Sequence, residues 1–212
     1  MARPNPDRRT QGLLAMSFLA AALSACNSRS ASPETASGAH PESSEYDGPA
    51  GTKWGEGPEE AKKALVASGL SFQGQDELGP GHVKQTFGGT YSGFATESVT
   101  TDFREGKLIA IIMMLPAADA RPASQRWQEM VDATSRTSGA PSKVTPLPQT
   151  GGVTDYLALD QKIKQGVPSP HATWFFKDVV VAISINGSKL DGKGGRLLRP
   201  SWGFFGPGAF HR

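Results

Sequence analysis

Residues 94–115 read FATESVTTDFREGKLIAIIMML, and this stretch decides the fold class. In its first half, Val99 and Phe103 share one face with polar residues between them, which is typical of a half-buried strand. Residues 107–115 are apolar on both faces, as expected of a central strand in a sheet. Residues 104–106 include a glycine suited to the positive φ of a hairpin turn. The stretch therefore predicts two neighbouring antiparallel strands.

Helical and strand patterns extend from this hairpin in both directions. Pro58 suits the first position of a helix, and Glu59 and Glu60 favour the positive end of its dipole. Residues 123–137 repeat apolar side chains at helical spacing, which predicts a second helix. Further strands are expected at residues 82–87, 153–159, 172–176 and 179–185.

The order of these elements is one helix, a group of strands, a second helix and another group of strands. Helices segregated to one side of antiparallel strands define the α+β class. We therefore predict an antiparallel sheet with two helices packed on one face, in a domain of residues 54–187. The order also fits two diverged αβββ halves from an internal duplication.

The N-terminal residues have the layout of a secretory signal. Arginines open it, and the uncharged apolar run at residues 13–23 is too short to span a bilayer, because a helix needs roughly 20 residues. The run ends in Leu23-Ser24-Ala25-Cys26. This tetrapeptide resembles the lipobox of bacterial lipoproteins. The resemblance implies that residues 1–25 are a cleaved signal peptide and that the Cys26 thiol carries lipid.

Cys26 is the only cysteine in the chain. An exported domain that uses cysteine normally uses pairs, so a single cysteine at a lipobox is better explained by lipidation. We expect a lipid anchor in the cell envelope. Asn27 favours the outer membrane by resemblance to lipoprotein sorting in Gram-negative bacteria, with the inner membrane as the alternative. Residues 26–53 are rich in small and polar residues and predict a flexible tether.

Cleavage of the signal peptide changes the charge of the chain. Lys+Arg falls from 22 to 19 and Asp+Glu from 20 to 19, so the mature chain is close to neutral. A neutral chain has no general attraction to nucleic acid, and we expect no such partner. The expected partners are the membrane, through the lipid anchor, and an envelope protein or polymer.

Three short patterns give the predicted domain a resemblance to known families. They are the entry Trp54-Gly-x-x-Pro-Glu-Glu60, the glycines and tyrosine at Gly89, Tyr91 and Gly93, and the strand residues Trp174-Phe175-Phe176. Together they resemble small exported domains of the β-lactamase-inhibitor-protein type and the small lipoprotein of the outer-membrane barrel-assembly machine. Such domains act by binding, so the resemblance implies no catalytic residue.

The side chains that common active sites need are present but scattered. No cluster of cysteines or acids accompanies the histidines, so no metal or other cofactor is expected; they are His40, His82, His171 and His211. Ser169 and His171 would need Asp155 or Asp160 to complete a catalytic triad, and polar loop residues beside a strand explain them better. An envelope hydrolase stays the less favoured alternative.

Residues 188–212 combine basic and aromatic residues with glycine and proline. One interpretation is a disordered end, or an arm that packs its aromatics on the domain. The other is a peptide that binds a membrane surface or a partner protein, because arginines attract anionic groups and aromatics favour interfaces. Its candidate binding residues are Trp202, Phe204, Phe205, Arg196 and Arg199.

The sequence as a whole favours a non-enzymatic binding module of the envelope. A structural or assembly lipoprotein of the outer membrane is the alternative. A flat or concave sheet face with exposed aromatics would favour binding, whereas a deep pocket with convergent titratable groups would favour an enzyme.

We predict that Cys26→Ser releases the chain from the membrane. The reason is that each buried methylene of an acyl chain contributes about 0.8 kcal/mol to membrane binding. Fractionation and immunoblotting should find Cys26→Ser in the soluble fraction and the control Ser30→Ala in the membrane fraction. A Cys26→Ser chain that stays with the membrane would contradict lipidation.

Overall fold

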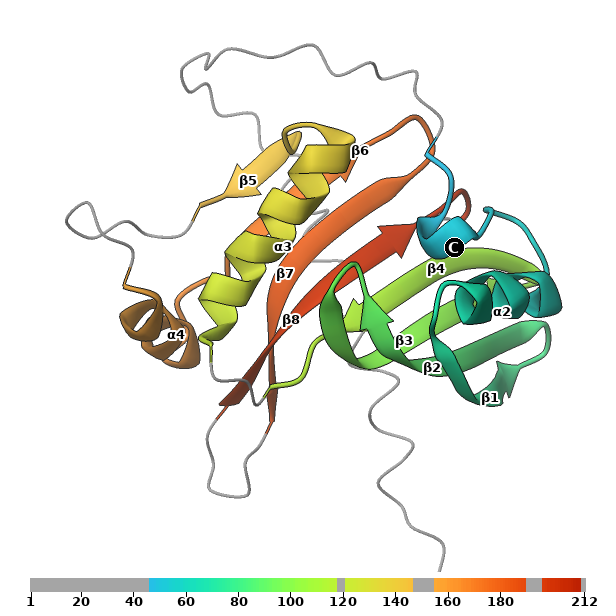
Figure 1. Ribbon diagram of the computed structural model, residues 1–212, viewed down its shortest axis with the longest axis horizontal. Helices are drawn as coiled ribbons and strands as arrows, with labels where there is room; N and C mark the ends of the chain where they lie inside the picture. Colours follow the sequence, from blue (N-terminus) through green and yellow to red (C-terminus); the bar gives the residue numbers. More distant parts are fainter. Residues whose placement is uncertain (1–45, 118–120, 147–154, 190–195, 211–212) are drawn as a thin grey trace, which may run out of the picture. The chain divides into compact units, whose positions relative to one another are not determined.

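The computed structural model describes residues 46–117, 121–146, 155–189 and 196–210. Within these ranges, eight antiparallel strands form one sheet in the order β1-β2-β3-β4-β8-β7-β6-β5 (Figure 1). The strands are β1 (Ser71–Gly79), β2 (His82–Tyr91), β3 (Phe94–Arg104), β4 (Lys107–Met114), β5 (Lys143–Thr145), β6 (His171–Phe175), β7 (Val180–Lys189) and β8 (Arg196–Phe205). The helices are α2 (Pro58–Ala67), α3 (Ala123–Ser138), α4 (Tyr156–Lys164) and the short 3-10 helix η2 (Pro49–Gly51). The α+β class is confirmed, whereas Cys26 and the predicted signal peptide lie outside the described residues.

The helices pack on one face of the sheet and share a single core with it. Helix α2 begins at Pro58, as predicted, and buries Ala61 and Leu65. Helix α3 buries Trp127 and Met130, and the Trp127 indole Nε1 donates to a β7 carbonyl oxygen at 3.1 Å. Leu159 and Ile163 of α4 belong to the same core. Figure 1 shows α3 lying across β7 and β6.

Helix α4 corrects one prediction, because residues 153–159 were expected to form a strand. Asp155 caps the helix: its carboxylate accepts from the backbone N–H of Leu157 at 3.1 Å and of Ala158 at 3.0 Å. Residues 153 and 154 lie outside the described ranges. The alternating pattern fitted a strand over a few residues, and the cap with the downstream Ile163 favours a helix.

Strand β1 was not predicted, because its sequence lacks an apolar alternation. Nearly all its side chains are exposed, and its register with β2 shifts between Phe72 and Gly74 and again between Glu77 and Gly79. It forms through backbone pairing with β2, which itself runs past the predicted end at Phe87 to Tyr91.

From each edge of the sheet to its centre, four strands follow one another in chain order. β1 to β4 run from one edge to the centre, and β5 to β8 run from the other edge to the centre, so β4 pairs with β8. The predicted number of three strands for each half was wrong. In the first half β1 was missed; in the second half β5 and β8 were missed, and residues 156–159 of the strand expected at residues 153–159 belong to α4. Helix α4 lies between β5 and β6 in the chain and has no counterpart between β1 and β2.

Strand β8 corrects the predicted domain end at residue 187 and the interpretation of residues 188–212 as a tail. It pairs with β4 on one side and β7 on the other, and places Trp202 opposite Met113 and Ile183. The side chains of Trp202 and Phe204 are only 2% and 3% exposed. Their alternation with Gly203 and Phe205 is a strand pattern, which the surrounding glycines and proline obscured.

Trp202 joins three parts of the core. The tip of the β2–β3 hairpin bends over the sheet, so that Tyr91 and Phe94 meet the indole edge-on at 5.7 Å and 5.1 Å between ring centroids. From α3, the Thr134 hydroxyl oxygen accepts a hydrogen bond from the Trp202 Nε1 at 3.0 Å. One side chain of β8 therefore contacts a helix and a hairpin as well as its neighbouring strands.

The domain begins earlier than residue 54. The Trp54 indole donates to the Tyr46 carbonyl at 3.0 Å, and the Tyr46 ring lies 4.7 Å from the Phe176 ring. Burial raises the pKa of the Tyr46 phenol. Thr52 is fully buried as well. Residues 46–53 thus belong to the folded domain, and the predicted tether boundary at residue 53 was wrong, because a few anchoring side chains are enough to order a polar segment.

We predict that Trp202→Ala lowers the free energy of unfolding by about 3–5 kcal/mol, the usual cost of truncating a buried tryptophan. Leu78→Ala is the control, because Leu78 is 54% exposed and its truncation should change stability by less than about 0.5 kcal/mol. Urea denaturation measures both. Equal effects of the two substitutions would contradict a core position for Trp202.

Candidate functional site: the open face of the sheet

The sheet face opposite the helices is called the open face here, because no described helix covers it. Strand side chains alternate between the two faces, and the pairing registers align the open-face residues of β4, β8, β7 and β6 in three cross-strand rows. The first row is Ala110, Phe205, Val180 and Phe175; the second is Ile112, Gly203, Ala182 and Thr173; the third is Met114, Ser201, Ser184 and His171.

The first row and its surroundings make an aromatic surface. Phe175 is 41% exposed, whereas Phe205 is half-buried because its ring lies over Gly203. A Cβ atom at Gly203 would come within 2.5 Å of that ring, so glycine is required for this packing. Phe210, in the turn after β8, adds a third ring 5.6 Å from that of Phe205. Three phenylalanines thus gather at one end of the open face.

The third row is polar and internally hydrogen-bonded. The Ser184 and Ser201 hydroxyls lie 3.2 Å apart, and the Asn186 amide donates to the Ser201 hydroxyl at 2.8 Å. At the sheet edge, His171 Nε2 lies 3.1 Å from the Thr145 hydroxyl. These contacts fix polar donors and acceptors on the same face as the apolar row.

Charged side chains on the open face lie at its margins: on β2 and β3, at Lys107 opposite Arg104, at Arg199 two residues before Ser201, and at Lys143 opposite Thr173. His82 Nε2 lies 2.6 Å from an Asp102 carboxylate oxygen, and Lys84 is opposite Asp102 in the register. Arg104 is opposite His82 in the same way. The three rows on β4, β8, β7 and β6 contain no Asp, Glu, Lys or Arg. The centre of the face therefore has no Asp, Glu, Lys or Arg, and its margins are charged.

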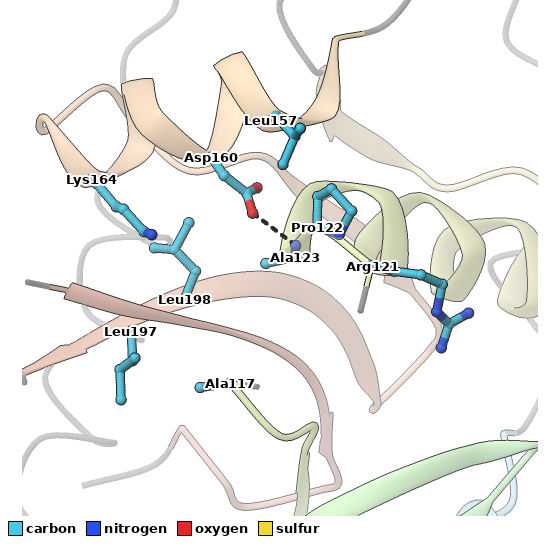
Figure 2. Close-up of a pocket in the computed structure, with 9 residues that line it drawn as sticks. All are labelled: Ala117, Arg121, Pro122, Ala123, Leu157, Asp160, Lys164, Leu197 and Leu198. Atoms are coloured by element: carbon cyan, nitrogen blue, oxygen red, sulfur yellow. Dashed lines mark hydrogen bonds between the residues drawn. The ribbon is translucent and has the colours of Figure 1, made fainter. Parts of the chain in front are cut away.

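A separate shallow depression of about 230 Å³ lies beside α4, at the start of α3 and β8 (Figure 2). The Asp160 carboxylate beside it accepts from the backbone N–H of Ala123 at 2.8 Å and of Ser124 at 3.0 Å, and so caps the N-terminus of α3. Its lining residues are Ala117, Arg121, Pro122, Ala123, Leu157, Asp160, Lys164, Leu197 and Leu198.

The residues considered for a catalytic triad have structural partners. Asp155 and Asp160 cap helices, and His171 bonds with Thr145 instead of an aspartate. In the described ranges, no group of three or more histidine, cysteine, aspartate or glutamate side chains could hold a metal ion.

The predicted binding residues of the C-terminal segment lie in different parts of the structure. Trp202 and Phe204 lie in the core, so their assignment as exposed binding residues was wrong; they alternate with the open-face residues of the same strand. Arg199 pairs with Glu97 at 3.0 Å, and the side chain of Arg196 lies outside the described part. Phe205 remains a candidate on the open face, and Arg196 and Arg199 stay predictions.

Sequence reasoning missed Phe175 and Val180 as site residues. Both were placed correctly in or beside predicted strands, but alternation alone does not tell which face of a sheet stays uncovered.

Comparisons with protein families, with curated proteins and with solved structures find no match. Among the described residues, no helix has the length and apolar character needed to cross a membrane. The function is therefore argued from the geometry of the site.

We predict that Asp160→Ala destabilises the domain by about 1–2 kcal/mol, because it leaves two N–H groups at the start of α3 without their carboxylate acceptor. Asp178→Ala, in the exposed turn between β6 and β7, should change stability by less than about 0.5 kcal/mol. Thermal and urea unfolding of both variants provide the comparison. If neither variant loses stability, the cap at α3 is dispensable.

Proposed function

We propose that this chain is a non-enzymatic binding module of the bacterial envelope and that its open face binds a partner protein. The observation that carries the proposal is the uncharged apolar row through Phe205 in the middle of the sheet, with charged side chains at the margins of the face. In protein interfaces, the central residues are depleted in charge and enriched in aromatics and methionine, and the rim is polar.

The side chains of the open face match that pattern. Phe205 and Phe175 supply aromatic area, and Met114 and Ile112 lie half-buried in the adjoining rows. All four come from paired strands, so they need little ordering when a partner binds, which lowers the entropic cost of association. Phe205 is the most constrained of them, because Gly203 lies beneath its ring.

Lipidation of Cys26 would hold this binding face close to a membrane, and the outer membrane is the favoured one. A structural or assembly role of the lipoprotein is a special case of the same proposal, in which the partner belongs to an envelope assembly. A hydrolase is less favoured, because Asp155 and Asp160 already serve as helix caps.

The two halves of the sheet also support an origin by internal duplication. Each half consists of a helix and four strands that run from an edge to the centre, and the last strand of each half pairs with the other. Under this hypothesis, α4 is a later insertion into the second half.

We predict that Phe175→Glu weakens partner capture at least about tenfold, because truncating or charging a central interface residue costs on the order of 2 kcal/mol. The lipidated chain serves as bait for detergent-solubilised envelope, and the captured protein is then titrated in purified form. Val66→Glu is the matched control, since Val66 is 48% exposed on α2, on the opposite side of the sheet.

Both variants must unfold at the temperature of the wild-type chain for the comparison to hold. Equal affinity of the two variants for the purified partner would contradict binding through the open face. If the chain hydrolyses a substrate and the Phe175→Glu variant keeps this activity, the result would instead favour the hydrolase.

A further inference from the structure

The tip of the β2–β3 hairpin, residues 90–97, is called the arm here. Its two strands are in register only with each other, because the register of β2 with β1 ends at Gly88 and that of β3 with β4 begins at Ser98. A register shift between Phe87 and Gly89 marks the point where the arm leaves the sheet and bends over it (Figure 1). The arm is thus a two-stranded projection whose position depends mainly on its side chains.

Two aromatic side chains hold the arm on the core. Tyr91 and Phe94 are half-buried and meet the Trp202 indole edge-on, at 5.7 Å and 5.1 Å between ring centroids. The Tyr91 ring also lies 6.3 Å from that of Phe204. Trp202 is only 2% exposed, so the arm closes the core above this side chain.

One ion pair ties the foot of the arm to β8. The Arg199 Nε atom lies 3.0 Å from a carboxylate oxygen of Glu97, the last residue of the arm. The Arg199 side chain is 25% exposed and that of Glu97 is 41% exposed, so solvent and ions can reach the pair. Arg199 lies at the margin of the open face, two residues before Ser201. The pair therefore connects the arm, which covers the core side of Trp202, with the opposite face of the sheet.

We propose that the arm is a strap that opens from Trp202 as one unit, and that the Glu97–Arg199 pair is the catch that holds it closed. Segments with few buried apolar contacts and exposed backbone hydrogen bonds open at a lower free energy than the whole domain. The arm has these properties, because two half-buried rings fix it and its ladder has no neighbouring strand. Since the catch lies at the margin of the open face, charges that bind or screen Arg199 there loosen the strap. This device does not depend on which partner the open face binds.

Residue-resolved hydrogen exchange of the purified full-length chain tests the opening. Amides of residues 90–97 should exchange by local opening, at rates that dilute urea hardly changes, whereas residues 99–103 of the same β3 should exchange only through global unfolding. Glu97→Gln should speed exchange in the arm about two- to fivefold, the effect of one exposed ion pair, and leave residues 99–103 unchanged. Sodium chloride at about 0.5 M should speed the arm of the wild-type chain but not that of Glu97→Gln, because salt screens the pair.

Glu129→Gln is the matched control, because it removes a carboxylate from an ion pair of comparable exposure, Arg121–Glu129, that involves no arm residue. Arg199→Gln should speed exchange in the arm as Glu97→Gln does. The double variant should add nothing further, since both substitutions remove the same pair.

The indole N–H groups give a second signal of the opening. The Trp202 Nε1 donates to the Thr134 hydroxyl, and its exchange should rise together with that of the arm. The Trp127 Nε1 donates to the Ile183 carbonyl inside the core, and its exchange should stay unchanged.

Three results would overturn the proposal. The first is exchange of residues 90–97 at the same rate as residues 99–103, which would make the arm part of the globally unfolding core. The second is equal exchange in Glu97→Gln and Glu129→Gln, which would leave the arm without a catch. The third is faster exchange of both segments in Glu97→Gln together with a lower unfolding temperature, which would mean general destabilisation. None of these results bears on partner capture by the open face, because that binding is measured with Phe175→Glu.

Discussion

The whole sheet depends on the insertion of β8 between β4 and β7. Without this strand, the described sheet would consist of two separate groups, because β4 and β7 have no other connection across the centre. Trp202 makes the insertion specific: its ring lies between the bent β2–β3 hairpin and α3, and its N–H is bonded to Thr134. The last of the described strands is therefore the one that completes the core.

The same strand also forms the centre of the candidate binding face. Alternation along β8 sends Trp202 and Phe204 to the core and leaves Ser201, Gly203 and Phe205 on the open face. The core and the proposed binding face are thus linked through adjacent residues of one strand. A side chain larger than hydrogen at Gly203 would displace the Phe205 ring and alter the open face without touching the core directly.

Local patterns were enough to predict the β3–β4 hairpin and helices α2 and α3, because their apolar periodicity matches their burial. The elements that were missed depend on non-local contacts. β1 is defined by pairing with β2, β5 by pairing with β6, and β8 by its place between β4 and β7. At the site, Phe205 was named as an exposed tail residue, whereas its role in the structure depends on Gly203 and on which face the helices leave uncovered.

The two edges of the sheet differ from its centre in a way that affects how copies of this chain behave at high local density. β5 is only three residues long, and β1 is interrupted by two register shifts and carries Asp76 and Glu77. Short, irregular and charged edges discourage strand-to-strand association between molecules. Copies of this chain at high concentration would consequently have little tendency to join through the edges of their sheets.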